Sequence, residues 1–212
     1  SLKDRCAIVG LGYTAQGRVP GRSAMSFYLE ASKNALADAG LHIQDIDGII
    51  IQPCPADPRV TADTIARDRG LNLCFGADQQ LHGASSCAIV QHAAMAVNAG
   101  LCNYCLCAFA DTSLSASPAT GIVYQMAIDT DAAYGMFSVA SGYAIIARRY
   151  MNEYGVTSRQ FGAVAVTFRR HASLNPIAQM RKPITIEDHQ NSRWVVEPLR
   201  LLDCCPVSDG GR

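Results

Sequence analysis

The sequence predicts an α/β fold in which helices cover both faces of a mixed, mostly parallel sheet. Short apolar runs bounded by glycine or proline alternate with longer stretches of helical periodicity, which is typical of this class. The runs at residues 49–51 and 104–110 are apolar at almost every position, as expected for strands buried on both faces. The chain has 212 residues, 49% of them hydrophobic, and is long enough for one large domain or two small ones.

Bulk properties exclude several classes of protein. The chain has no formal net charge at pH 7 and no basic block, which argues against nucleic acid as the main partner. No apolar run approaches the about 20 residues that a membrane span requires, and residues 1–5 do not resemble a signal peptide. Nine cysteines without a secretory signal indicate a reducing compartment, so we expect a cytoplasmic protein in which most cysteines act as small hydrophobic residues.

The first half of the chain predicts an alternation of strands and helices. Residues 6–10 are predicted to form a first buried strand. Residues 10–15 match the dinucleotide pattern G-x-G-x-x-A, but a loop with Gly17 and Pro20 follows instead of a helix, so this site is not favoured. A helix over residues 23–39 begins with the capping residue Ser23 and ends before Gly40. Further elements are a strand at 49–51, a short helix at 61–69 and a strand at 73–75.

The stretch from residue 81 to residue 111 is the centre of the predicted domain. Residues 84–99 are rich in alanine and lack proline and glycine, which predicts a helix. This helix is small and apolar on nearly every side, so we expect it to be buried. Residues 79–83 form a tight loop at its N-terminus, where free N–H groups and the helix dipole would favour a nucleophile or a developing oxyanion.

The second half predicts less regular structure. Residues 111–134 are long and weakly periodic, and their apolar part at 122–126 favours a packed lid. Helices are predicted over 136–154 and from Ser158 to about residue 173, and a polar, extended covering segment follows from residue 177. The predicted division is therefore 1–110 and 135–176 as parts of one domain, 111–134 as a lid, and 177–212 as a covering segment leading to a missing final strand.

Several strings resemble the thiolase superfamily, and in particular its sterol-carrier or lipid-transfer-type branch. They are AIVG at 7–10, ALADAG at 35–40 with DIDG at 45–48, AAMAV at 93–97 with AG at 99–100, RRYM at 148–151 with EYG at 153–155, and PLRLLDCC at 198–205 with SDG at 208–210. The resemblance implies the N-terminal half of a thiolase with a loop domain over the active site. It also implies that the catalytic histidine and second catalytic cysteine of the family lie in a second half. Coenzyme A would be part of the substrate, and no tightly bound cofactor is expected.

The resemblance also exposes a departure at the nucleophile. Counting back without gaps from residues 99–100 places the family's nucleophilic cysteine at Gly83. The nearest thiol, Cys87, is one helical turn later, which is about 5.4 Å along the axis. This pattern is more similar to thiolase-like steroid side-chain aldolases, which cleave a 3-hydroxyacyl-CoA by retro-aldol chemistry with a small OB-fold partner subunit. Thiolysis of a 3-ketoacyl-CoA by Cys87 and a non-catalytic subunit remain the alternatives.

Each candidate site residue has a functional and a structural interpretation. His82 is a candidate donor or base, or a loop histidine bonded to backbone. Cys87 is a candidate nucleophile or a buried small hydrophobic residue, and His92 is expected to be a core histidine. Tyr124 and Met126 are candidate substrate contacts, or packing residues of the lid. A sheet without its final strand would leave an edge uncovered, so we expect a homodimer, or a heteromer with an OB-fold partner or a second thiolase half.

Two further groups of side chains have an ordinary structural interpretation beside a functional one. Cys102, Cys105 and Cys107 have no adjacent histidine, and alternation places the last two on one face of a strand, so no metal site is predicted. Four cations could meet the phosphates of coenzyme A or could form an ordinary solvated face. They are Arg169, Arg170, Arg181 and Lys182.

Overall fold

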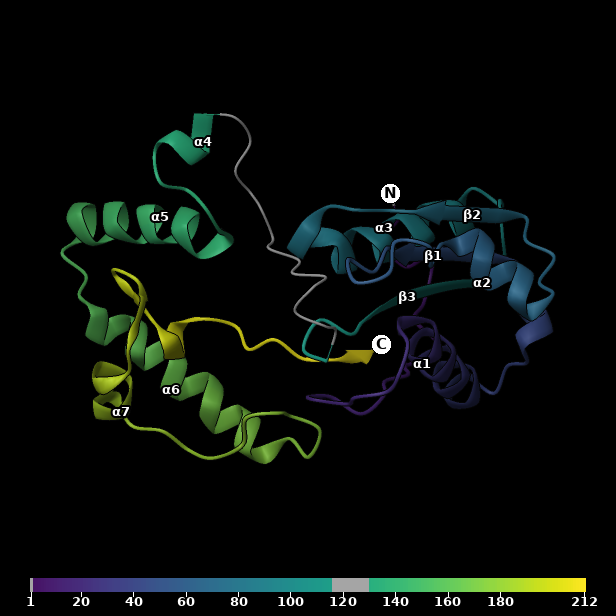
Figure 1. Ribbon diagram of the computed structural model, residues 1–212. Helices are drawn as coiled ribbons and strands as arrows, with labels where there is room; N and C mark the ends of the chain where they lie inside the picture. The colour runs from purple at the N-terminus through teal and green to yellow at the C-terminus, as the bar shows by residue number, and fades with distance from the viewer. Residues whose placement is uncertain (1, 116–129) are drawn as a thin grey trace. The chain divides into compact units, whose positions relative to one another are not determined.

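The computed structural model describes residues 2–115 and 130–212. The chain forms two compact units, Ser1–Thr120 with Ser208–Arg212 and Gly121–Val207. Figure 1 labels the helices of both units and strands β1, β2 and β3.

A four-stranded sheet forms the centre of the first unit. Its strands are β2 (Phe75–Asp78), β1 (Gly48–Gln52), β3 (Cys105–Asp111) and β6 (Gly210–Gly211), in that spatial order. Strand β1 runs parallel to β2 and β3, whereas β6 pairs antiparallel with β3. The sheet is therefore mixed and mostly parallel, as the sequence predicts.

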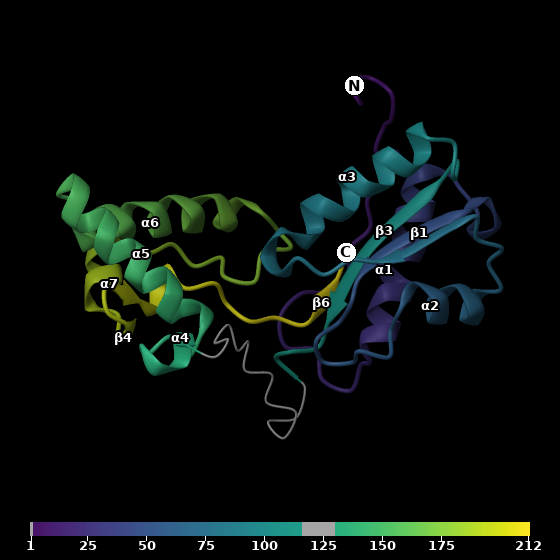
Figure 2. The same cartoon turned by 90° about the horizontal axis from the view of Figure 1, so that it is seen from above.

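Helices cover both faces of this sheet, which confirms the predicted fold class. Helices α1 (Ala24–Ala39) and α2 (Ala62–Arg69) share a core with Ile49 and Ile51, and α3 (Ser85–Asn98) packs on Ile50 from the other side. Figure 2 shows α3 on one side of β1 and β3, with α1 and α2 on the other. The three isoleucines are fully buried because consecutive strand residues point to opposite faces, and each burial contributes about 1.5–3 kcal/mol.

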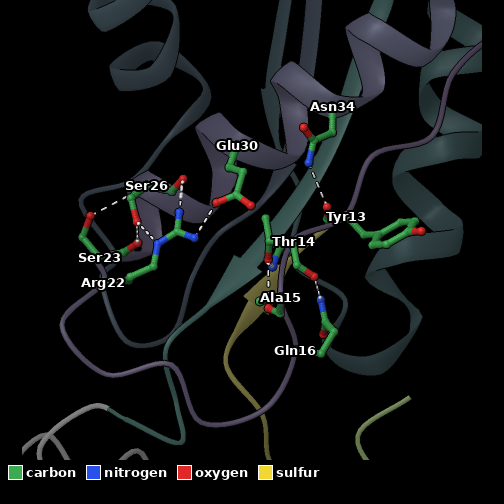
Figure 3. Close-up of polar contacts among 10 residues, drawn as sticks. Tyr13, Thr14, Ala15, Gln16, Arg22, Ser23, Ser26, Glu30 and Asn34 are labelled. Atoms are coloured by element: carbon green, nitrogen blue, oxygen red, sulfur yellow. Dashed lines mark hydrogen bonds and ion pairs between the residues drawn. The ribbon is translucent and has the colours of Figure 1, made fainter. Parts of the chain in front are cut away.

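Local signals define the start of α1 (Figure 3). The Ser23 hydroxyl accepts the Ser26 N–H at 3.2 Å, and the Arg22 guanidinium binds Ser26 and Glu30 one and two turns into the helix. Farther along, the Asn34 side chain donates to the Tyr13 carbonyl at 3.0 Å and holds the preceding extended segment against the helix.

The G-x-G pattern near the N-terminus has a packing explanation. A Cβ on Gly10 would lie 2.3 Å from the Ala35 carbonyl oxygen, and one on Gly12 would lie 2.1 Å from that of Ala31. Only glycine permits so close an approach of this segment to α1. The two glycines therefore serve packing between two backbones.

Three expectations for the first unit are wrong. Residues 6–10 form no strand; they are extended, and Ile8 is 79% exposed because no described strand pairs with this segment. The strand expected at 73–75 begins only at Phe75, since the Cys74 N–H donates to the Asp47 carbonyl ahead of β1. Helix α3 forms where predicted but is not buried all round, because Val90 and Met95 are 41% and 50% exposed on the face turned away from the sheet.

The second unit is built from α4 (Thr130–Ala133), α5 (Val139–Tyr154), α6 (Ser158–Leu174), α7 (Ile186–Asn191) and the hairpin of β4 (Trp194–Val196) and β5 (Leu199–Arg200). The two long helices confirm the prediction, although Thr157 rather than Ser158 caps α6. The extended segment expected from residue 177 is wrong, because a capping box between Thr185 and Asp188 starts α7 within it.

A buried histidine joins α7 to the rest of the second unit. His189 has no exposed surface, and its Nε2 lies 2.7 Å from Oδ1 of Asp203. Its Nδ1 accepts a hydrogen bond from the Gln190 side-chain amide at 3.0 Å. Gly162 of α6 packs directly on the ring. Among the residues that the structure describes, no helix combines the length and the apolar character needed to cross a membrane.

Candidate functional site

The candidate site lies where β2 ends and α3 begins. In open α/β sheets, ligands bind beyond the carboxyl ends of the parallel strands, and residues 79–84 occupy such a position. The Gln79 N–H donates to the Ile51 carbonyl at 2.9 Å, so the loop leaves the sheet from a fixed point.

The turn that opens α3 has a strained backbone. Residues His82–Ala84 form a single 3₁₀ turn, and His82 has a φ of +50°. For a residue with a side chain, this left-handed conformation costs of order 1–3 kcal/mol and is concentrated at functional sites. The His82 side chain itself is exposed.

A buried serine holds this turn in place. Ser85 has no exposed surface, and its Oγ accepts the Leu81 N–H at 2.8 Å while it lies 2.8 Å from the His82 carbonyl, to which it donates. The side chain therefore fixes the backbone on both sides of the strained residue. Ser85 is a positioning residue that the sequence does not single out, although a serine at a helix start is a known capping signal.

Two backbone N–H groups are available at this helix mouth. His82 and Gly83 are the first two residues of the turn, so no carbonyl of the helix precedes them at hydrogen-bonding spacing. Both lie at the positive end of the α3 dipole. A Cβ on Gly83 would meet nothing within 4 Å, so open space lies beside this residue. The arrangement is suited to hold an oxygen that gains negative charge.

The Cys87 thiol is displaced from this point. Cys87 is the third residue of α3, four residues after Gly83, and this spacing is about 6 Å along a helix. Its side chain is exposed, so the interpretation as a buried small hydrophobic residue is wrong. The structure brings His82 and Gly83 together in one turn and puts Cys87 on the next.

His92 links α3 to the site loop. Its Nδ1 lies 3.2 Å from Oε1 of Gln79, and its ring meets the ring of Phe75 edge-on at 5.4 Å between centroids. His92 is half-buried rather than part of the core, and its partner is Gln79, which sequence reasoning did not identify.

A second pair of polar side chains lies at the same sheet edge, just after β1 and at the end of β3. The buried Cys54 thiol donates to Oδ1 of Asp111 at 3.3 Å. Burial, reinforced by the Asp111 carboxylate, raises the pKa of Cys54 to about 12, so this thiol is protonated at neutral pH. The pair was not predicted, because Cys54 follows β1 in a loop with three prolines and its partner is 57 residues away.

The other candidates give a mixed outcome. Tyr124 and Met126 lie outside the described residues. In the part of the chain that the structure describes, no three His, Cys, Asp or Glu side chains cluster in a way that would hold a metal ion. Arg169 donates to the Lys182 carbonyl at 3.0 Å and Arg181 to that of Ser173 at 3.4 Å, so two of the four cations fasten the segment after α6 to the helix.

No protein-family model matches the chain. Comparison with individual proteins, in contrast, finds relatives that share one reaction class in their names. The chain is 42% identical over 232 residues to a steroid side-chain-cleaving aldolase of Thermomonospora curvata and 41% identical over 220 residues to a 17-hydroxy-3-oxo-4-pregnene-20-carboxyl-CoA lyase of Mycobacterium tuberculosis. These matches cover 100% and 99% of this chain but 56% of each relative. The chain therefore spans about half the length of the curated relatives it matches.

Solved structures agree with these relatives. An Ltp2-ChsH2(DUF35) aldolase superposes with a TM-score of 0.84 at 42% identity, over 97% of this chain and 53% of that one. A monomeric SCP2-thiolase-like protein type 1 from Mycobacterium smegmatis superposes with a TM-score of 0.70 at 18% identity, over 96% of this chain and 44% of that one. At 18% identity, the similarity to the SCP2-thiolase-like protein shows a shared fold and nothing more.

Proposed function

We propose that this chain, which belongs to the thiolase superfamily, forms one half of an enzyme that cleaves a carbon–carbon bond of an acyl-CoA thioester by a retro-aldol reaction. The observation that carries this proposal is the identity of residue 83. A glycine occupies the turn at the mouth of α3, and the nearest thiol of that helix lies one turn farther on. Relatives named as aldolase and CoA lyase support the same reaction class.

The chemistry explains why a glycine favours this reaction. Thiolysis of a 3-ketoacyl-CoA needs a thiolate that takes up the acyl group, so it requires a nucleophile at the reacting carbon. Retro-aldol cleavage of a 3-hydroxyacyl-CoA needs a base that removes the hydroxyl proton and donors that stabilise the thioester enolate. The C2–C3 bond breaks, its electron pair passes to the enolate, and protonation of C2 yields the shorter acyl-CoA with a ketone or aldehyde.

Each residue of the turn has a proposed role. The N–H groups of His82 and Gly83 would stabilise the enolate oxygen, and the His82 imidazole would donate a hydrogen bond or act as base. The open space beside Gly83 would admit a bulky substrate carbon such as a steroid side chain. Tyr124 and Met126 remain proposed substrate contacts, coenzyme A is proposed as part of the substrate, and no tightly bound cofactor is proposed.

Thiolysis by Cys87 is the second candidate. The exposure of Cys87 favours it, because an exposed thiol is available to an acyl group. The displacement of about 6 Å along α3 opposes it, since a nucleophile must meet the same oxyanion donors as the carbonyl it attacks.

We also propose that the active species is an oligomer in a cytoplasmic setting. The similar aldolase structure carries a two-component name. Apolar side chains of the first unit are exposed, among them Ile8 at 79% and Met95 at 50%, and a large exposed apolar area commonly marks an interface. A homodimer, a second thiolase half and a small OB-fold subunit are the proposed partners. A chain that adds only fold and interface, without chemistry, is the third candidate.

The test uses the full-length protein with its partner subunits. A 3-hydroxyacyl-CoA with a steroid side chain and the matching 3-ketoacyl-CoA together with free coenzyme A are supplied in parallel; the carbonyl product and the shorter acyl-CoA are measured in the first reaction and the two acyl-CoA products in the second. Cys87→Ala is compared with Cys205→Ala, an exposed cysteine of the second unit. Retro-aldol chemistry predicts the same rate for both variants. Thiolysis predicts a loss of roughly 10³-fold or more for Cys87→Ala alone, because the nucleophile is removed.

His82 needs variants that separate its side chain from its backbone. His82→Ala is expected to lower kcat by roughly 10²-fold or more if the imidazole acts as base. His82→Asn keeps a residue that tolerates the left-handed conformation but lacks the base. Equal loss in both variants supports the imidazole role, and unchanged kcat in both removes it. Absence of every product, with all partners present, would favour the non-catalytic candidate.

A further inference from the structure

Two cysteines outside the candidate site face the same small space. Cys102 lies in the connection from α3 to β3, and Cys105 is the first residue of β3, so they form a C-x-x-C pair. Gly48 of β1 lies opposite Cys105 in the sheet register. A Cβ on Gly48 would lie 2.7 Å from the sulfur of Cys102 and 3.3 Å from the sulfur of Cys105. The absent side chain of Gly48 thus leaves a space in which both sulfurs meet.

The backbone between the two cysteines is held by a single carboxylate. Asp47 accepts hydrogen bonds from the N–H groups of Asn103 and Tyr104 at 2.9 and 2.8 Å and from the Asn103 side chain at 2.8 Å. The N–H of Gly48 donates in return to the Tyr104 carbonyl at 3.1 Å. The two thiols are therefore held near one another by the fold, which removes most of the entropy loss of joining them.

We propose that Cys102 and Cys105 are a site of reversible disulfide formation with small-molecule disulfides of the glutathione type. The half-buried Cys105 is the sulfur that reacts first, because Cys102 is only 4% exposed. The Cys105 thiolate attacks one sulfur of the oxidant, forms a mixed disulfide and releases one glutathione thiolate. Cys102 then attacks the Cys105 sulfur and releases the second glutathione. Two thiol protons pass to the two departing thiolates, so the protein loses two hydrogens and one disulfide is reduced.

The environment explains why this pair rests in the dithiol state. Burial, together with the negative charge of Asp47, raises the pKa of Cys102 above that of an ordinary thiol. The hydrogen bond that Cys105 makes with Cys107, with burial second, raises the pKa of Cys105 as well. Thiolates are therefore scarce at neutral pH and exchange is slow, so oxidation needs a sustained excess of oxidant.

Two neighbouring cysteines are poorer partners. Cys107 interacts with Cys105 in the reduced state, but it is two residues away in the same strand, so the two Cα atoms are about 6.6 Å apart, near the upper limit for a disulfide. Cys74 is exposed and lies ahead of β2, whereas the three atoms nearest to a Cβ on Gly48 all belong to Cys102 and Cys105. The proposed disulfide therefore joins Cys102 to Cys105 and not to either neighbouring cysteine.

The experiment equilibrates the native full-length protein in buffers with increasing ratios of oxidised to reduced glutathione. Free thiols are then alkylated, and the intact mass and the peptides are analysed. We expect a fraction that has lost two hydrogens, with one peptide that carries Cys102 and Cys105 unalkylated, and full reversal by excess reduced glutathione. In Cys102→Ser, the mixed disulfide with glutathione is expected to accumulate on Cys105, because the second step is blocked.

The control variant is Cys204→Ser, in the second unit, which is expected to oxidise like the unchanged protein. A disulfide between Cys74 and Cys102 would overturn the assignment. Absence of any Cys102–Cys105 disulfide at the most oxidising ratio, with the protein still folded by circular dichroism, would overturn it too. None of these readouts depends on enzymatic activity, so the result is independent of the proposed function.

Discussion

A buried carboxylate at the end of the described chain offers the sharpest test of the first unit. Asp209 has no exposed surface, and its two oxygens accept the N–H groups of Val19 at 2.8 Å and of Leu114 and Ser115 at 2.9 Å each. The side chain thus joins the loop before α1 to the segment after β3. Two substitutions test this role, Asp209→Asn and Asp209→Ala.

The magnitudes follow from the number of N–H groups left without an acceptor. A buried polar group without its partner costs about 1–3 kcal/mol. Asparagine keeps one carbonyl oxygen for Leu114 and Ser115 and turns an amide NH₂ toward the Val19 N–H, so we expect a loss of roughly 1–3 kcal/mol. Alanine removes all three acceptor contacts, and we expect a loss of roughly 3–9 kcal/mol. Such a loss is a large fraction of the 5–15 kcal/mol of a typical domain.

The charge adds a dependence on pH. Burial of Asp209 favours its neutral form, but the hydrogen bonds that it accepts outweigh burial and hold its pKa below the usual range. A lowered folded-state pKa stabilises the fold above the unfolded-state value, which is about 3.9. This contribution is lost as the pH falls through the lower folded-state pKa. The unfolding free energy of the unchanged protein is therefore expected to fall below about pH 4–5 more steeply than that of Asp209→Asn.

The assay combines urea unfolding, followed by far-UV circular dichroism at pH 7 and near pH 3, with hydrogen exchange read by mass spectrometry. Peptides that contain Val19 and Leu114 are expected to exchange roughly 10- to 100-fold faster in Asp209→Asn. This factor is the expected loss of unfolding free energy converted at about 1.4 kcal/mol per tenfold change in exchange rate. Asp68→Asn, an exposed carboxylate beside Arg69, is the matched control. Equal stability of Asp209→Asn and Asp68→Asn at pH 7 would refute the reasoning.

Three other substitutions test further contacts. Gly162→Ala is expected to destabilise the second unit by roughly 1–3 kcal/mol, because its Cβ would lie 2.9 Å from Nδ1 of His189. Alanine normally favours a helix over glycine, so a stabilised variant would contradict this contact. Urea unfolding followed by Trp194 fluorescence measures the change in unfolding free energy. Asp203→Ala leaves the Nε2–H of His189 and the N–H of Arg200 without their acceptor and is expected to cost about 1–3 kcal/mol more than Asp203→Asn in the same titration, whereas equal losses would show that these two hydrogen bonds contribute little. His82→Gly is expected to have an unfolding free energy about 1 kcal/mol higher than that of His82→Ala, since glycine adopts a positive φ without strain. Equal urea-unfolding midpoints for the two variants would contradict the strained turn.

The elements that sequence reasoning located correctly carry local signals. Helix α1 begins after Ser23 and ends at Gly40, and both residues perform the capping roles that their types predict. The run of isoleucines in β1 is buried on both faces, as an unbroken apolar strand should be. Signals of this kind extend over a few residues, so spacing in the sequence is enough to identify them.

The features that sequence reasoning missed depend on contacts between distant residues. Asp209 binds Val19 across 190 positions, and Cys54 binds Asp111 across 57. A local pattern contains no information on such pairs. The prediction of a strand at residues 6–10 was wrong for a related reason. The segment has the apolar composition of a strand, but strand formation also requires a partner at hydrogen-bonding distance.

At the candidate site, the contacts that fix the backbone do not involve residue 83, where the chemistry is proposed. The strained turn is fixed by Ser85 and by the exit of Gln79 from the sheet, and neither contact involves a side chain at residue 83. Gly83 has no positive φ, and a Cβ there would meet nothing within 4 Å, so the backbone does not require glycine. Gly83→Cys is therefore expected to keep the melting temperature within a few degrees while lowering retro-aldol turnover, because the sulfur fills the space offered to the substrate. An alkylating acyl-CoA analogue should label that residue in preference to Cys87; preferential labelling of Cys87 would place the reacting carbon one turn farther along α3 and favour thiolysis.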